Sequence, residues 1–199
     1  MGASDPRQAF RFCPSCNEEV YTYAVQTDLG PELRCSACGL PLATAAALGP
    51  ERLECVLVAD DSRVYRTLLR DVLLERKLAA TVEVCASGPE LLARAATRFQ
   101  EHLPVKLVIL DVMMTPLNGP ATGMALRALE KGLGVSPPAP ILFVSGSALE
   151  ETMKTLLGKC APALFLHKGA DKGPAALGQR LEQVMATLLK GGPKGGSTR

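Results

Sequence analysis

The sequence predicts an α/β protein with a doubly wound, five-stranded parallel sheet. From about residue 53 to residue 190, short apolar segments alternate with segments whose apolar residues recur at helical spacing. The middle apolar segment, Leu107–Val112, is interrupted only by Asp111, as expected for a strand buried on both faces of a parallel sheet. Because parallel neighbours need a crossover helix, this alternation indicates successive strand–helix units.

Composition narrows the class of protein. A chain of 199 residues has room for one ordinary domain and a small companion, and its 47% hydrophobic content supports a packed core. The formal net charge of +2 is too balanced to indicate an extended nucleic-acid or membrane surface. No segment approaches the roughly 18 apolar residues of a membrane span, and the first eleven residues contain no apolar signal-peptide core. We therefore expect a cytoplasmic protein.

Two Cys-x-x-Cys pairs, separated by eighteen residues, precede the α/β region. Each pair turns tightly enough to aim both sulfurs at one point, and two pairs complete a tetrahedral site. We predict a Zn²⁺ ion bound by Cys13, Cys16, Cys35 and Cys38, in a module over 12–42 that resembles a zinc ribbon. Four thiolates leave no open coordination position, so the metal is expected to be structural. Rubredoxin-like iron is the less favoured alternative.

The segment between the cysteine pairs is typical of a hairpin. Residues 20–25 are strand-like and residues 28–31 are turn-like. So short a module has little core, and bound metal is expected to supply stability. The first fifty residues hold three Arg and five acidic residues, a balance that favours a protein-binding module over DNA binding. The three other cysteines lie in apolar segments and are expected in the core: Cys55, Cys85 and Cys160.

The chain is therefore expected to divide into five parts. These are a flexible arm over 1–11, the four-cysteine module over 12–42, a linker over 43–52, the α/β domain over 53–190 and a disordered tail over 191–199. The chain ends soon after the last helix of the α/β domain, so we expect no DNA-binding output domain after it.

The α/β domain is expected to contain five strand–helix pairs. Serines three residues before a glutamate mark two helix starts, Ser87 with Glu90 and Ser147 with Glu150. The predicted strands are 55–59, 81–86, 107–112, 141–144 and 163–166. The predicted helices are about 62–78, 87–99, 121–131, 147–157 and 174–190. The buried stripe of the first helix is expected to be Val64, Leu68, Leu69, Val72 and Leu73.

Polar residues stand where several predicted strands end: Asp60, Asp61, Asp111, Ser145 and Lys168. The carboxyl ends of parallel strands share one edge, so these side chains are expected to meet there. Three carboxylates in one crevice repel each other unless a divalent cation lies among them, and Mg²⁺ prefers oxygen ligands. A lysine and a hydroxyl beside such a cluster are what a phosphoryl group requires. The sequence therefore predicts phosphoryl transfer to an aspartate.

Residues 53–190 resemble the receiver domain of two-component response regulators. The matching motifs are the Asp60–Asp61 pair, Asp111 in LVILDVMM, Ser145 in ILFVSGSA, and Phe165 and Lys168 in FLHK. The resemblance implies a flavodoxin-like (βα)5 fold. It also implies that Asp111 accepts a phosphoryl group from a histidine kinase or a phosphotransfer protein.

The resemblance assigns a role to each matching residue. Mg²⁺ would be held by Asp60 (through water), Asp61, Asp111 and the carbonyl group of Met113. Lys168 would pair with the phosphoryl group. Ser145 would bind it by a hydrogen bond and draw the following loop inward, which lets Phe165 change rotamer.

Three features of the sequence depart from the family pattern. The loop over 113–123 is longer or differently registered, and either Gly119 or Gly123 corresponds to the family's glycine. Gly169 follows Lys168 where the family commonly has proline. The residues two after Asp111 and two after Ser145 are uncharged and unsuited to orient water, so a long-lived phospho-aspartate is expected.

We therefore expect a response regulator whose enzyme activity is limited to self-phosphorylation and autodephosphorylation. Its output would pass to a protein partner through the four-cysteine module or the face near Phe165, and phosphorylation could drive dimerisation. One alternative is a pseudo-receiver, a scaffold that is never phosphorylated. Another is a Mg²⁺-dependent phosphatase with an aspartate nucleophile, which the lack of any lid insertion disfavours.

Overall fold

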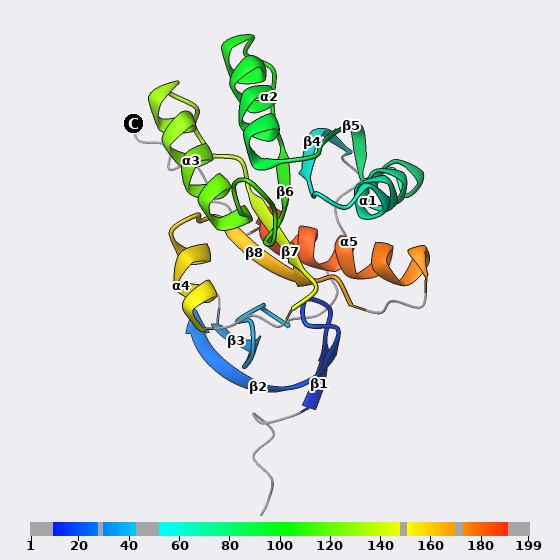
Figure 1. Cartoon of the computed structure of the whole chain (residues 1–199). Helices are drawn as coiled ribbons and strands as arrows, with labels where there is room; N and C mark the ends of the chain where they lie inside the picture. The colour runs from blue at the N-terminus through cyan, green and yellow to red at the C-terminus, as the bar shows by residue number, and fades with distance from the viewer. Residues whose placement is uncertain (1–9, 28–29, 43–51, 148–150, 170–172, 191–199) are drawn as a thin grey trace, which may run out of the picture.

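The computed structural model describes residues 10–27, 30–42, 52–147, 151–169 and 173–190. This part of the chain forms a small antiparallel sheet and a five-stranded parallel sheet with helices on both faces (Figure 1). The strands are β1 Phe10–Cys13, β2 Glu18–Thr27, β3 Gly30–Cys35, β4 Leu53–Ala59, β5 Ala79–Cys85, β6 Leu107–Asp111, β7 Ile141–Ser145 and β8 Ala163–His167. The helices are α1 Arg63–Glu75, α2 Gly88–Gln100, α3 Gly119–Gly132, α4 Glu151–Gly158 and α5 Pro174–Lys190.

The parallel sheet has the strand order β5-β4-β6-β7-β8, which confirms the doubly wound prediction. The central strand β6 is buried along its whole length. Alternate residues of β4 point to opposite faces: Val56 and Val58 pack with α1 and α5, while Leu57 packs with α2, α3 and α4. The sheet therefore has one core layer on each face, and β8 lies at one edge of it.

Polar caps decide where three of the helices begin. The side chains of Ser62 and Ser87 accept hydrogen bonds from backbone N–H groups in the first turns of α1 and α2. α3 begins two residues before the predicted start, because Asn118 caps it and Pro120 fits its first turn.

The predicted apolar stripe of α1 is wrong at Val64, which is 80% exposed. Leu69 and Leu73 form the buried face of the helix together with Val72. Val64 lies one turn before Leu68, which is only partly buried at the margin of this face. Val64 therefore projects from the helix toward the solvent.

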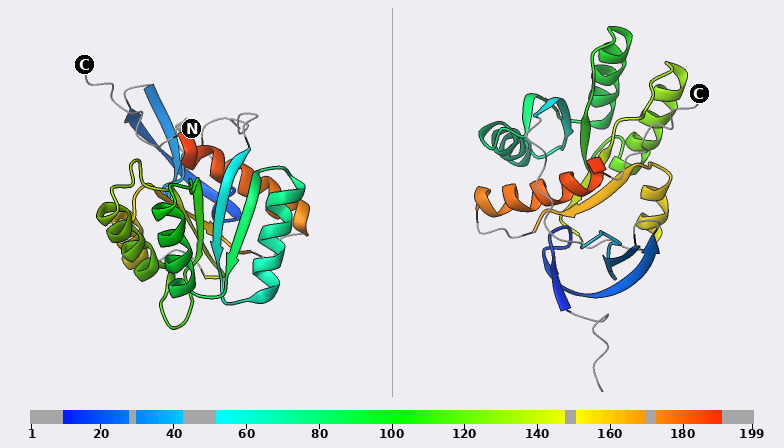
Figure 2. Two further views of the ribbon diagram at one scale, coloured as in Figure 1. Left: turned by 90° about the horizontal axis from the view of Figure 1, so that it is seen from above. Right: turned by 180° about the vertical axis from the view of Figure 1, so that it is seen from behind.

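The small sheet has the order β1-β2-β3 and lies beside α4, β8 and α5 (Figure 1; Figure 2). Its inner face carries Val20 and Thr22, and Leu40 follows it. The apolar members, Val20 and Leu40, join the same core cluster as Leu166 of β8 and Leu181 of α5. The four-cysteine module therefore shares a core with the α/β fold, which the sequence analysis did not predict.

Several predicted features lie outside the described residues. They are residues 1–9 of the predicted arm, 28–29 of the predicted turn, 43–51 of the predicted linker, 148–150 at the predicted start of a helix, and the predicted tail from residue 191. Within the described ranges, every helix is too short or too polar to cross a lipid bilayer.

Candidate functional site

Three carboxylates meet at the carboxyl ends of β4 and β6, as the sequence predicts. Asp60 is fully buried, Asp111 is 3% exposed and Asp61 is open to solvent. One oxygen of each carboxylate lies within 4.8 Å of the others. All the donors are oxygens and one side of the group is open to water, which fits the coordination that Mg²⁺ prefers.

Lys168 reaches this group from the end of β8. Its Nζ lies 2.7 Å from Oδ2 of Asp60 and 3.0 Å from Oδ1 of Asp111. It also lies 4.6 Å from the ring centre of Tyr65, which is close enough for a cation–π contact. Tyr65 was missed in the sequence analysis, although its place in the first turn of α1, just after the strand-end acids, is a signal that it covers this edge.

The electrostatics of Asp111 result from its burial and its neighbours. Burial raises the pKa of Asp111, and the negative charge of Asp60 raises it further, while Lys168 opposes both effects. Backbone donors hold the two buried carboxylates in place. Oδ1 of Asp60 accepts a hydrogen bond from the N–H of Ser62 (2.9 Å), and Oδ1 of Asp111 accepts one from Met113 (3.3 Å). The site is short of positive charge, which a divalent cation would supply.

The other predicted residues lie near this group in different ways. Ser145 is buried at the end of β7; its carbonyl accepts a hydrogen bond from the N–H of Lys168 (2.6 Å) and its hydroxyl accepts one from Ser147 (3.1 Å). Phe165 is buried in the core layer beneath α4. The side chain of Met113 is 69% exposed, whereas that of Met114 is buried.

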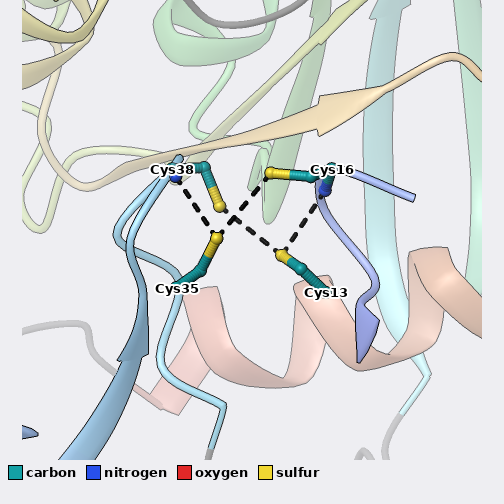
Figure 3. Close-up of side chains that lie close together, drawn as sticks. All are labelled: Cys13, Cys16, Cys35 and Cys38. Carbon is teal, nitrogen blue, oxygen red and sulfur yellow. Dashed lines mark hydrogen bonds between the residues drawn. The ribbon is translucent and has the colours of Figure 1, made fainter. Parts of the chain in front are cut away.

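The four cysteines of the N-terminal module form the second candidate site (Figure 3). The Sγ atoms of Cys13 and Cys38 are 3.6 Å apart, and those of Cys16 and Cys35 are 3.8 Å apart. A zinc ion with bonds of about 2.3 Å to a tetrahedron of sulfurs needs S–S separations of about 3.8 Å. The arrangement therefore fits a tetrahedral metal site, and all four thiols are free.

Each cysteine pair is held by its own backbone. The N–H of Cys16 donates to Sγ of Cys13, and the N–H of Cys38 donates to Sγ of Cys35. Hydrogen bonds from Cys13 and Cys16 lower the pKa of the Cys35 thiol, and the hydrogen bond with Cys13 raises the pKa of Cys16. Four sulfurs this close cannot all carry a charge without a cation among them.

Comparison with known proteins identifies the α/β fold. The family model of the response regulator receiver domain matches residues 56–175 of this chain. This chain belongs to that family. A search of curated proteins gave no match.

Solved receiver domains share the fold of this chain. The receiver domain of the histidine kinase CKI1 from Arabidopsis thaliana, solved with Mg²⁺ and BeF3⁻, is 23% identical with a TM-score of 0.54; the match covers 68% of this chain and 91% of that one. A CheY-like receiver from Methanospirillum hungatei is 22% identical with a TM-score of 0.51, and covers 69% and 95%. CheY4 of Vibrio cholerae is 22% identical with a TM-score of 0.50, and covers 66% and 98%.

The structure distinguishes the two glycines of the atypical receiver loop. A Cβ on Gly119 would lie against the carbonyl oxygen of Asp111, well inside van der Waals contact, and 3.0 Å from Cα of Val112. The N–H of Gly119 donates to the carbonyl of Val112 (3.0 Å). Gly123 instead packs against the ring of Phe143. Gly119 is therefore the glycine that lets α3 approach the backbone of the candidate acceptor.

The conformation of the loop after Lys168 explains why glycine stands where the family commonly has proline. Gly169 has φ +56°, which proline cannot adopt. His167, at the end of β8, is half-buried. Its Nδ1 accepts a hydrogen bond from the N–H of Gly169, and Nε2 lies 3.0 Å from the carbonyl oxygen of Gly146. The remaining cysteines, Cys55, Cys85 and Cys160, are buried in the core as predicted.

Proposed function

We propose that this receiver protein is a response regulator of a phosphorelay, phosphorylated on Asp111 by a histidine kinase or a phosphotransfer protein. The observation that carries the proposal is the position of Lys168, whose ammonium lies between the buried carboxylates of Asp60 and Asp111. An oxygen of Asp111 would attack the phosphorus of a phosphohistidine. The P–N bond breaks, its electron pair stays on the imidazole nitrogen, and an acyl phosphate forms.

Each residue of the site has a role in this reaction. We assign Mg²⁺ binding to Asp60, Asp61, Asp111 and the carbonyl group of Met113. Bound Mg²⁺ would supply positive charge to the phosphoryl oxygens. Lys168 would move from the carboxylates to the phosphoryl group, and Ser145 would donate a hydrogen bond to it. Phe165 would change its packing as the loop after β7 moves.

Incubation with acetyl phosphate and Mg²⁺, followed by intact mass measurement, tests this function. We expect one phosphoryl group per chain, none in Asp111→Asn, and an unchanged amount in the matched variant Asp71→Asn on α1. A chain that never forms the adduct would be a pseudo-receiver scaffold. Acetyl phosphate turnover without an adduct would indicate the phosphatase alternative.

We also propose that residues 12–42 form a zinc-ribbon module, next to a receiver domain over 53–190. The sulfur separations support one tetrahedral metal per chain. Elemental analysis should find zinc rather than iron. Thiol titration should find that all seven cysteines react slowly in the metal-loaded protein. A chelator should make the four cysteines of the metal site reactive. The other three should react only on unfolding because they are buried; burial raises the pKa of Cys85 to about 12.

An exposed aromatic surface supports the ribbon as the place where a protein partner binds. Phe10, Phe12, Tyr21 and Tyr23 are each at least 44% exposed. Phe10 pairs with Tyr21 in the β1–β2 register, so the alternation along both strands places all four on the outer face. They are half of the eight Phe and Tyr residues of the chain, and such a patch is typical of a protein interface.

A photo-reactive residue tests this surface in native cells. Placed at Tyr21, it should capture a partner protein in a phosphorylation-dependent manner. Placed at Val64, an exposed apolar residue on α1, it should not. Equal capture at the two positions would exclude the aromatic surface as the output site.

A further inference from the structure

The turn that carries the first two cysteines is seated on the receiver strand that ends just before Lys168. We propose that metal occupancy of the four-cysteine site regulates phosphorylation of Asp111 by fixing the position of Lys168. This inference rests on the proposed function and deepens it. The turn Cys13–Cys16 is called the first knuckle, and Cys35–Cys38 the second knuckle.

The first knuckle pairs with the open edge of the parallel sheet. Ser15, between the two metal ligands, is 1% exposed. Its hydroxyl donates a hydrogen bond to the carbonyl of Phe165, and its own carbonyl accepts one from the N–H of His167 at 2.6 Å. β8 is the edge strand, so these bonds pair backbone groups that the sheet itself leaves open.

A buried arginine of α5 stabilises the contact between the first knuckle and β8. Arg180 is 4% exposed. Its Nε donates to the carbonyl of Pro14 (2.7 Å), and its Nη2 lies 2.6 Å from the carbonyl oxygen of His167 and 3.4 Å from that of Ser15. A buried guanidinium is costly unless its donors are satisfied. Loss of the knuckle would remove two of the carbonyls that satisfy Arg180 and disturb the end of β8.

Lys168 lies between His167, which is bonded to the first knuckle, and Gly169, which packs against the residue after the knuckle. On one side, His167 is bonded to Ser15. On the other side, a Cβ on Gly169 would lie 2.5 Å from Nδ2 of Asn17, so the loop runs directly against the residue that follows the knuckle. Lys168 itself is held by its N–H bond to Ser145 and by its ion pair with Asp111. Movement of the knuckle would therefore move the ammonium group.

The second knuckle lies against the receiver in a different way. A groove of about 380 Å³ lies beside it, lined by Ser36, Cys38, Lys154, Leu157 and Phe165. Ser36 is exposed, whereas Ser15 is buried. The two serines therefore offer a matched pair of variants in the same metal site, and only Ser15 is in the path to Lys168.

Metal binding fixes the shape of the first knuckle, because both of its ends are ligands. If the metal-bound shape of the first knuckle fits β8 best, metal binding favours the seating of the knuckle on β8, and that seating favours metal binding by the same factor. Couplings of this kind are commonly about 5- to 150-fold. We expect metal removal to loosen the end of β8 and to slow phosphorylation of Asp111 by about fivefold or more.

The experiment combines hydrogen exchange with phosphorylation kinetics on the full chain, with zinc bound and after removal by a zinc-selective chelator in excess Mg²⁺. Metal removal should speed exchange of the His167 and Lys168 amides while the Val108 amide of β6 stays protected. The rate of acetyl phosphate labelling should fall in parallel. With zinc retained, Ser15→Ala should slow labelling, and Ser36→Ala should not.

The outcomes are distinct. Unchanged exchange at Lys168, or changed exchange with an unchanged labelling rate, would overturn the regulation. Faster exchange at Lys168 in a protein that is never labelled would overturn the phosphorelay function and leave the link between the metal site and Lys168 standing. If chelation also exposes Val108, the zinc-loaded Ser15→Ala and Ser36→Ala pair decides: equal labelling rates overturn the proposal.

Discussion

The ammonium of Lys168 lies 3.0 Å from a carboxylate oxygen of Asp111. Asp111 ends β6 and Lys168 follows β8. These two strands are not neighbours, because β7 lies between them. The pairing places a cation beside a carboxylate that is both buried and next to a second buried acid. Lys168 thus offsets the negative charge of the two acids, and under the proposed function it would pair with a phosphoryl group at Asp111.

Replacement of Lys168 with methionine should slow phosphorylation by about tenfold or more, because the positive charge that stabilises the incoming phosphoryl group is lost. Labelling with acetyl phosphate at saturating Mg²⁺ measures the effect. Lys106→Met is the control, since Lys106 is an exposed lysine that pairs with the exposed Glu54. An unchanged rate in Lys168→Met would remove this residue from the mechanism.

Replacement of Asp111 with asparagine should stabilise the metal-free protein at pH 7. Burial and the charge of Asp60 raise the pKa of Asp111, so the folded state favours the uncharged form of this side chain. The folded wild type therefore loses stability as pH rises through this pKa, and the variant does not. Denaturant unfolding should show a gain at pH 7 that shrinks as the pH is lowered. A gain that is independent of pH would contradict this explanation.

The phospho-aspartate should persist well beyond seconds. Met113 and Ser147 stand two residues after Asp111 and Ser145, and neither side chain is charged or suited to orient an attacking water. Loss of the phosphoryl group can be followed by intact mass after removal of acetyl phosphate. Met113→Glu should shorten the lifetime, whereas Met124→Glu, another exposed methionine, on α3, should not. Release within seconds in the wild type would show that another group activates water.

Gly119→Ala should destabilise the receiver by about 1–3 kcal/mol, because the new Cβ overlaps the backbone of Asp111 and Val112. Gly132→Ala is the matched control in the same helix: a Cβ there meets nothing within 4 Å, and alanine favours the helix by up to about 1 kcal/mol. The two free energies of unfolding should therefore change in opposite directions. Equal changes would show that the contact at Asp111 is easily relieved.

The sequence alone determined the parallel sheet and most members of both candidate sites, although not Tyr65. Apolar periodicity is a local property, and it marked residues 107–112 as the central strand, which the structure has as Leu107–Asp111. Parallel strands end at one edge, so Asp60, Asp111 and Lys168 had to lie close together once the order of elements was known. In the same way, the spacing of the two Cys-x-x-Cys pairs predicted that Cys13 and Cys38 lie close together in one metal site.

Only the tertiary structure decided how the two sites are joined. The contacts that seat Ser15 and Arg180 at β8 are made largely with main-chain carbonyls, and a carbonyl carries no signature in the sequence of residues. The same holds for Gly169, which local reasoning treated as a departure from proline and which the packing of Asn17 explains. Side-chain chemistry can be listed from a sequence, whereas backbone groups acquire partners only when the chain is folded.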